Sequence, residues 1–164
     1  MEISFKKASK DDFASIAAMG RSVWMETYPP IIGIGQTEYM IEKFQSEEAI
    51  IRQTGHENYE YYLIMADSER AGYAGIQPYN GLYLSKLYIL KKYRRLGIGR
   101  KALEFLKGIC SERGLGRIWL TVNRHNAQAI RSYLSWGMSV EKEMVSDIGN
   151  GFVMDDFVFE VKAK

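Results

Sequence analysis

Hydrophobic and polar positions follow two different patterns along this chain, and the change falls near residue 58. Before it, apolar residues recur every three or four positions, which predicts helices. The elements expected there are a strand at 3–7, a helix at 9–25 begun by Ser9, a loop at 28–35 and short helices at 37–44 and 46–53. The loop is expected because Pro29-Pro30 and two glycines interrupt any regular element.

From Tyr59 onward, short aromatic and β-branched runs predict strands, and Asn80-Gly81 is a strong hairpin signal. The elements expected are strands at 59–66, 73–77, 82–90, 117–122, 139–142 and 154–161 and helices at 97–113 and 126–136. The last two strands are joined near Asn150-Gly151. Strand 82–90, the following helix and strand 117–122 form one parallel βαβ unit. The pattern therefore predicts a single α/β domain, 1–164, with a mixed, mostly antiparallel sheet and helices on both faces.

Composition limits the classes of function. The 164 residues are 46% hydrophobic and 26% charged, as in a folded soluble protein, and the net charge of +2 argues against a nucleic-acid or membrane surface. Cys110 is the only cysteine, so neither an internal disulfide nor a cysteine zinc cluster can form. His56 and His125 show no metal-ligand spacing. We expect a cytoplasmic protein without a metal.

The segment 91–100 carries the clearest chemistry. A strand ends, a basic loop follows, and Gly97 and Gly99 open a helix. A helix N-terminus offers unpaired backbone N–H groups and a partial positive charge, and glycines let a ligand approach the backbone. Arg94, Arg95 and Arg100 add positive charge around this point. The segment therefore predicts a diphosphate site.

Two other interpretations of this segment are weaker. Residues 97–102 fit the G-x-G-x-x-G/A pattern of a Rossmann fold, but the next strand ends Thr121-Val122-Asn123, without the acid that binds ribose. The basic residues at 91–95 could form a nucleic-acid patch, but the charge is confined to one loop.

Two motifs together indicate a family. Arg94–Gly99 matches Q/R-x-x-G-x-G/A, and Asn126–Tyr133 followed by Gly137 resembles N-x-x-A-I-x-x-Y-x-x-x-G-F. Both are similar to motifs of the GNAT superfamily of N-acetyltransferases, and the resemblance covers most of the chain from Tyr59 onward. Met138 stands where that family usually has Phe. The N-terminal third has a weaker likeness to bacterial polyamine acetyltransferases.

The resemblance implies acetyl-CoA as co-substrate. Its pantetheine arm would pair with strand backbone, its diphosphate would bind the glycine loop, and a backbone N–H of Tyr88 or Ile89 would stabilise the oxyanion. The residues expected at the cofactor are Leu87, Tyr88, Ile89, Arg94, Arg95, Leu96, Gly97, Ile98, Gly99, Arg100, Asn126 and Tyr133. Asn126 is also expected to cap its helix.

Tyr133 is the expected acid for the leaving thiolate; the alternative is a packed aromatic residue. The base is harder to identify. Tyr83 stands where histone acetyltransferases place a Glu, so a water chain ending on Glu26 is expected. Glu26, Tyr28 and Asp155 are expected to bind the acceptor. Alternation along the last strand requires one of Asp155 and Asp156 to face inward.

The function expected is acetyl transfer from acetyl-CoA to a primary amine of a small molecule, by direct attack in a ternary complex. Acetylation of a protein N-terminus or lysine and a non-catalytic coenzyme A sensor are the alternatives. A homodimer is compatible with the sequence.

Overall fold

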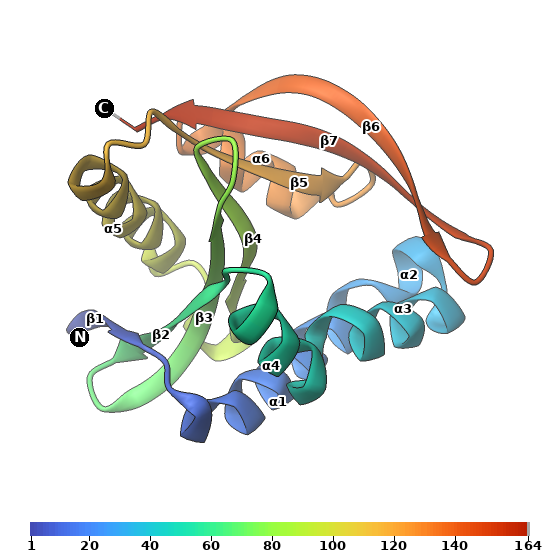
Figure 1. The fold of residues 1–164 in the computed structure, drawn as a ribbon, viewed down its shortest axis with the longest axis horizontal. Helices are drawn as coiled ribbons and strands as arrows, with labels where there is room; N and C mark the ends of the chain where they lie inside the picture. The colour runs from blue at the N-terminus through green and yellow to red at the C-terminus, as the bar shows by residue number, and fades with distance from the viewer. Residues whose placement is uncertain (164) are drawn as a thin grey trace. The chain divides into compact units, whose positions relative to one another are not determined.

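The computed structural model describes residues 1–163, which form two compact units (Figure 1). Unit 1 comprises Met1–Pro78 and Leu84–Phe105, and unit 2 comprises Tyr79–Tyr83 and the residues from Leu106 onward. Among the described residues, seven strands are hydrogen-bonded in the order β1-β2-β3-β4-β5-β7-β6. The β4–β5 pair is parallel. This confirms the predicted α/β class with a mixed, mostly antiparallel sheet.

Unit 1 holds the N-terminal helices and the first strands. Its elements are β1 (Ile3–Lys7), η1 (Lys10–Asp12), α1 (Phe13–Thr27), α2 (Pro29–Ile32), α3 (Ile34–Met40), η2 (Ile41–Gln45), α4 (Glu47–His56), β2 (Glu60–Ala66), β3 (Glu69–Pro78) and η3 (Lys91–Tyr93). It also contains most of β4 (Leu82–Ile89) and the first half of α5 (Ile98–Arg113). The predicted strands and long helices of this part are confirmed within a few residues.

The predicted loop at 28–35 is wrong. Residues Pro29–Ile32 form α2, and after Gly33, at φ 84°, the chain enters α3. Proline lacks an N–H group, but the N–H groups of a first helical turn have no partner inside the helix, so prolines at the start of α2 remove no helical hydrogen bond. The prediction treated Pro29-Pro30 as helix breakers, which prolines are in the interior of a helix but not in its first turn.

The faces of the β2–β3 sheet in unit 1 bury different clusters. One cluster joins α1 and α4 to the sheet through Ile16, Ile50, Tyr61 and Tyr73. The other contains Ile64, Ala71, Tyr93 and, from α5, Ile98 and Ala102. Burial of this much apolar surface is the main force that holds the helices on the sheet.

Unit 2 contains β5 (Arg117–Asn123), α6 (Ala127–Ser135), β6 (Ser139–Gly149) and β7 (Phe152–Lys162). Its strand β7 pairs antiparallel with both β5 and β6. The β6–β7 turn has positive φ at Asn150 and Gly151, as its predicted hairpin requires. Leu82 and Tyr83, at the start of β4, pair in parallel with Ile118 and Trp119 of β5.

Strand β6 continues to Gly149, so the predicted strand at 139–142 is too short. Its first seven residues are all exposed, on both faces of the strand. Because neither face is buried, selection for alternating apolar side chains is weak there, and the pattern that predicts a strand is missing.

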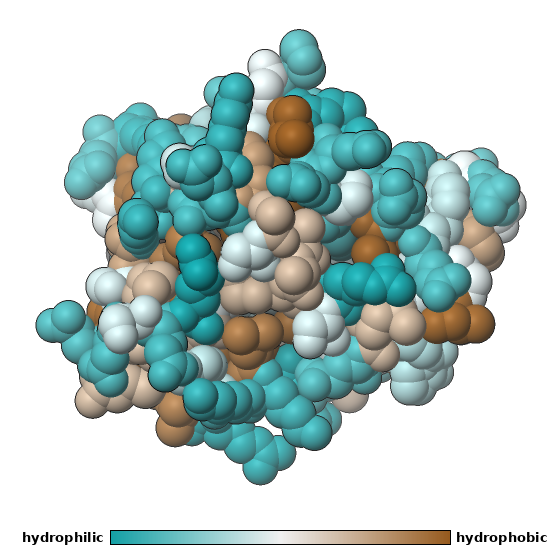
Figure 2. Space-filling model, turned by 90° about the horizontal axis from the view of Figure 1, so that it is seen from below, coloured by the Kyte–Doolittle hydropathy of each residue, from teal (hydrophilic) through white to brown (hydrophobic). Residues whose placement is uncertain are grey.

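On the face of the molecule drawn in Figure 2, hydrophilic side chains predominate around smaller hydrophobic groups.

Candidate functional site

The loop that leads into α5 contains two residues in the left-handed region. Arg95 has φ 64° and Gly97 has φ 77°. A non-glycine residue in this conformation is uncommon, and alternation of left- and right-handed residues turns successive N–H groups toward one concave side. Ile98 is buried and anchors the helix, whereas Arg95, Leu96, Gly97 and Arg100 are exposed and Gly99 is half-buried. The loop therefore presents backbone N–H groups and exposed cations in one segment.

Arg94 connects this loop to α1. Its Nη1 lies 2.6 Å from Oε1 of Glu26, and its Nε donates to the carbonyl oxygen of Ile89 at 2.9 Å. Both charged side chains are partly exposed. The predicted base and the first residue of the predicted diphosphate motif are therefore an ion pair, at the point where β4 ends.

Tyr28, at the end of α1, belongs to an aromatic group. Its ring stacks on Trp24 with 4.1 Å between centroids, and Tyr88 meets Trp24 edge-on at 6.4 Å. The indole Nε1 of Trp24 is buried and has no hydrogen-bond partner among the described residues. On β4, Tyr88 packs on the α1 side of the sheet, whereas Leu87 and Ile89 pack against the cluster that includes α5.

A buried polar network that the sequence analysis did not identify is centred on Lys86 of β4. The residue is 3% exposed, and its Nζ donates to the carbonyl oxygen of Phe44 and, at 3.1 Å, to Oε1 of Gln53. The ring of Tyr61 lies 5.2 Å from the same Nζ, and the Tyr61 hydroxyl donates to Oε1 of Gln53. Burial lowers the pKa of Lys86 to about 7. Alternation from Leu82 and Leu84 places Lys86 inward, so this signal was present in the sequence.

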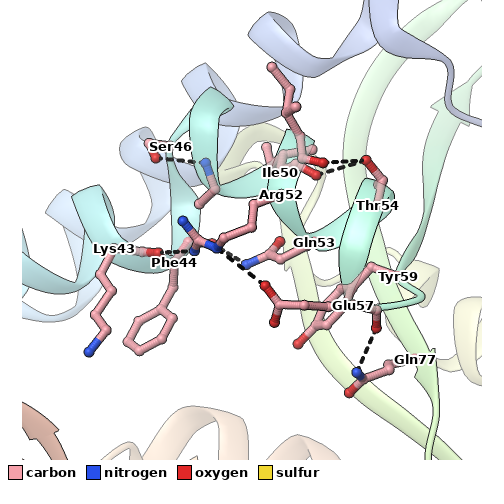
Figure 3. A network of polar contacts seen from close by, with 12 residues as sticks. Lys43, Phe44, Ser46, Ile50, Arg52, Gln53, Thr54, Glu57, Tyr59 and Gln77 are labelled. Carbon is pink, nitrogen blue, oxygen red and sulfur yellow. Dashed lines mark hydrogen bonds and ion pairs between the residues drawn. The ribbon is translucent and has the colours of Figure 1, made fainter.

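The α4 side of this network is drawn in Figure 3. Gln53 Nε2 donates to the Phe44 carbonyl at 3.1 Å, and Arg52 reaches both the Lys43 carbonyl and the Glu57 carboxylate. These bonds satisfy carbonyls at the end of η2, which would otherwise be left without partners where one helical segment stops and the next begins.

In unit 2 the second predicted motif forms the start of α6. The Asn126 side chain accepts from the backbone N–H of Ala129, which confirms its predicted role as helix cap. About two turns after Asn126, the Tyr133 ring packs against Phe159 of β7 at 5.9 Å and against Trp136 at 5.5 Å. The predicted cofactor residues Asn126 and Tyr133 therefore share one short helix on the Phe159 face of β7.

Asp155 and Asp156 have different surroundings. Asp155 Oδ1 accepts from Arg124 Nε at 2.9 Å, and this side chain is 45% exposed. Asp156 is 4% exposed, and burial, followed by the neighbouring charge of Asp155, raises its pKa to about 6. Asp156, which sequence reasoning left as the alternative to Asp155, is therefore the buried member of the pair.

Residues 1–163 contain no candidate metal centre. No group of three or more His, Cys, Asp or Glu side chains in that range could hold a metal ion. Over the same residues, no helix combines the length and apolar character that crossing a bilayer requires. Cys110 is buried, and burial raises the pKa of its thiol.

Comparison with known proteins gives consistent matches. The model of the acetyltransferase (GNAT) family matches residues 21–138. A spermidine N(1)-acetyltransferase of Thermoplasma acidophilum is 27% identical, over 94% of this chain and 97% of its own. A PaiA N-acetyltransferase from the same organism, solved with coenzyme A, superposes with a TM-score of 0.80 at 24% identity and covers 99% of both chains.

A spermidine N-acetyltransferase from Vibrio cholerae, solved with coenzyme A and spermine, has the same fold. Its TM-score is 0.69 at 13% identity, over 98% of this chain and 95% of that one. The family model covers most of the sequence, including both predicted motifs up to Met138, and the sheet and helices agree with the solved structures. This chain therefore belongs to the acetyltransferase (GNAT) family.

Proposed function

We propose that this protein transfers the acetyl group of acetyl-CoA to a primary amine of a small molecule. The observation that carries this proposal is the loop 94–97, whose left-handed Arg95 and Gly97 lead into α5 within the family motif. The relative that is 27% identical is named for acetylating spermidine, a small polyamine. This supports a small amine as the class of acceptor.

The donor would use the backbone of unit 1 for most of its contacts. N–H groups from Arg95 to Arg100 would bind the diphosphate, because an anion at a helix start gains both hydrogen bonds and a favourable dipole. The exposed guanidinium groups of Arg95 and Arg100 would add positive charge on the solvent side of the diphosphate. Backbone groups of Leu87, Tyr88 and Ile89 would pair with the pantetheine amides, as an added strand does.

Transfer would proceed by direct attack of the amine in a ternary complex. A route through an acetylated cysteine needs an accessible thiolate, and Cys110 is buried with a raised pKa. Tyr133 would then protonate the coenzyme A thiolate, since a phenol of pKa ~10 can donate to a sulfur whose thiol pKa is ~8.5. The Tyr133→Phe variant tests this role. Its kcat should fall by roughly 10²-fold, with little change in acetyl-CoA binding.

Glu26, Tyr28 and Asp155 remain predictions for acceptor binding, and Glu26 also for the base. The ion pair with Arg94 supports a different task for Glu26, which is to hold the Arg94 guanidinium at the end of β4. Asp155 is held in a similar way by Arg124. Both carboxylates therefore already have a cationic partner within the protein itself.

The decisive experiment is a panel of amines incubated with acetyl-CoA, followed by detection of the free thiol released. Polyamines and other small primary amines should release thiol. Lysine peptides and α-amino peptides belong in the same panel, and a preference for them would replace the small-molecule acceptor by a protein one. Acetyl-CoA binding without thiol release from any amine would indicate a sensor.

The Gly99→Glu variant gives the matched test of the donor site. A side chain and a negative charge would both enter the proposed diphosphate site, so acetyl-CoA binding measured by calorimetry should be lost while the thermal unfolding transition persists. Unchanged affinity in the folded variant would remove this loop from the donor site.

A further inference from the structure

Asp156 lies on the face of the unit 2 sheet opposite to α6. In an antiparallel pair, side chains of directly opposed residues share a face, and successive residues alternate. Asp156 opposes Asn123 on β5 and Met144 on β6, whereas Phe159 opposes Leu120 and Val140. Since Tyr133 of α6 packs on Phe159, three residues from Asp156, the two functional groups project from opposite faces of the strand.

Asp155 shares the α6 face with Phe157 and Phe159. The Arg124 guanidinium that binds Asp155 also lies over the Phe157 ring, 4.9 Å from its centroid, and reaches Glu143, which opposes Phe157 in the ladder. Arg124 is therefore committed to that face. It leaves Asp156, on the other face, without this cation.

Asp156 is a buried residue, but its carboxylate oxygens are not among the fully enclosed side-chain atoms. It is 4% exposed, yet it receives no hydrogen bond and joins no ion pair within residues 1–163. The other buried aspartate, Asp12, accepts from the backbone of Ser9 at 2.9 Å and pairs with Arg70. A largely buried charge without partners in the fold is costly, which makes this carboxylate a candidate for a contact with a bound molecule.

We propose that Asp156 is the general base of the transfer and takes a proton from the ammonium group of the acceptor. This inference rests on the proposed function. The resulting neutral nitrogen attacks the thioester carbonyl, a C–N bond forms, and the C–S bond breaks with its electron pair on sulfur. Tyr133 protonates that thiolate. The second proton of the nitrogen returns to the Tyr133 oxygen through solvent, and Asp156 releases its own proton to solvent.

The need for such a base follows from the acceptor. An alkyl amine of pKa ~10.4 is neutral in fewer than about one molecule in a thousand at pH 7. A carboxyl group whose pKa is raised to about 6 is still mostly ionised at pH 7 and is a stronger base than an ordinary aspartate. A carboxylate also attracts the ammonium group before it removes the proton.

The other charged groups near Asp156 are few. Asp155 raises its pKa, and Arg124 and Glu143 lie on the opposite face. On its own face the next charged residue of β7 is Glu160, which is paired with Arg117 at 3.0 Å. Asn123 and Met144, directly opposite on β5 and β6, are neutral. Lys142 of β6 opposes Val158, so it lies on the same face as Asp156 and one ladder position away along β7. The titration of Asp156 should therefore respond to a bound acceptor and to the charge of Lys142.

The test compares Asp156→Asn with Glu160→Gln, a partnered carboxylate on the same strand and face. For the wild type and Glu160→Gln, kcat/KM for a polyamine should level off above a midpoint near pH 6. For Asp156→Asn we expect a loss of roughly 10²-fold or more at pH 7 and a rise of about tenfold per pH unit up to pH 9, because only neutral amine can then react. A weakly basic acceptor such as trifluoroethylamine should show a much smaller loss.

Thermal unfolding and acetyl-CoA titration of each variant show whether fold and donor site are intact. If the wild type acetylates amines and folded Asp156→Asn stays within about threefold of it at every pH, Asp156 is not the base and the proposed function stands. If the wild type transfers acetyl to no amine, the proposed function itself fails. A loss in Asp156→Asn that is equal at all pH values and for both acceptors also overturns the role as base.

Discussion

Lys86 in unit 1 and Asp156 in unit 2 are both ionisable residues buried in strands, at 3% and 4% exposure. Lys86 has two oxygen acceptors and an aromatic ring around its Nζ. Asp156 has no hydrogen bond or ion pair within residues 1–163, and the neighbouring charge of Asp155 disfavours its ionised form. Burial alone therefore does not separate the two residues. What separates them is that the described part of the chain supplies partners for the Lys86 ammonium group and none for the Asp156 carboxylate, which is the basis of the role proposed for Asp156.

The pKa values support this division. Burial disfavours the charged form of each residue, so it lowers the pKa of Lys86 to about 7 and raises that of Asp156 to about 6. A neutral lysine keeps two N–H groups, which match the two acceptors at Phe44 and Gln53. Lys86 is therefore satisfied in either protonation state. Asp156 has no protein partner in either state, among the described residues.

The largest effect we expect is on stability, from the Lys86→Ala variant. Removing this side chain should lower the free energy of unfolding by about 3–5 kcal/mol, because it leaves a cavity and takes one donor from the Phe44 carbonyl and one from Gln53. Lys86→Met keeps the volume and loses only the hydrogen bonds, so its cost should be about 1–3 kcal/mol. Chemical denaturation at neutral pH measures both.

The pH dependence of kcat/KM should also distinguish the role of Lys86 from that of Asp156. Lys86→Met should retain the pH dependence of kcat/KM at temperatures where it is folded. A Lys86→Met protein that is fully stable but has lost the pH-dependent step would break the comparison, since the partnered residue would then be the one involved in proton transfer.

The Asp156→Asn variant should be more stable than the wild type at pH 8. The pKa of Asp156 is raised in the folded state, from 3.8 to about 6, so its contribution favours folding below pH ~4 and is lost as the pH rises through 6. Two pKa units correspond to at most about 3 kcal/mol, which the amide should recover at pH 8 and not at pH 4. Thermal unfolding at both pH values measures the difference, with Glu160→Gln as control.

A variant that is less stable at pH 8 would mean that the Asp156 carboxylate has a favourable partner in the folded protein. The contrast with Lys86 would then disappear, whatever the activity of the variant.

How far the sequence predicts the molecule depends on whether a residue's role is local. The strand at 82–90, the helix at 97–113 and the cap Asn126 were all predicted because their signals are periodicity, glycines and capping chemistry close in sequence. The contact of Glu26 with Arg94 could not be predicted, because it joins residues 68 positions apart. Strand alternation predicts that Asp155 and Asp156 face opposite ways, but it does not say which faces inward.

Lys86 shows a different limit. Its inward position follows from Leu82 and Leu84, so a buried lysine was predictable. Its acceptors were not, because the Phe44 carbonyl lies at the end of the five-residue π-helix η2, a rare element without a recognisable sequence pattern. The sequence therefore predicts which way the Lys86 side chain points, but not which groups accept its hydrogen bonds.

The smallest effect we expect concerns Glu26, the other carboxylate considered as a base. Because Arg94 binds its Oε1 at 2.6 Å, Glu26→Gln should weaken the hold on Arg94 and raise the KM for acetyl-CoA only a few-fold, which corresponds to the ~0.2–1 kcal/mol of a partly exposed ion pair. The turnover rate and its pH profile should not change. Steady-state kinetics at several pH values distinguish the two parameters, and Glu57→Gln, which breaks the exposed pair with Arg52, is the matched control (Figure 3).

A turnover rate lowered roughly 10²-fold and restored at high pH would instead assign the base to Glu26. In that case a partnered carboxylate would do the proton transfer, and the distinction drawn between Lys86 and Asp156 would not extend to catalysis.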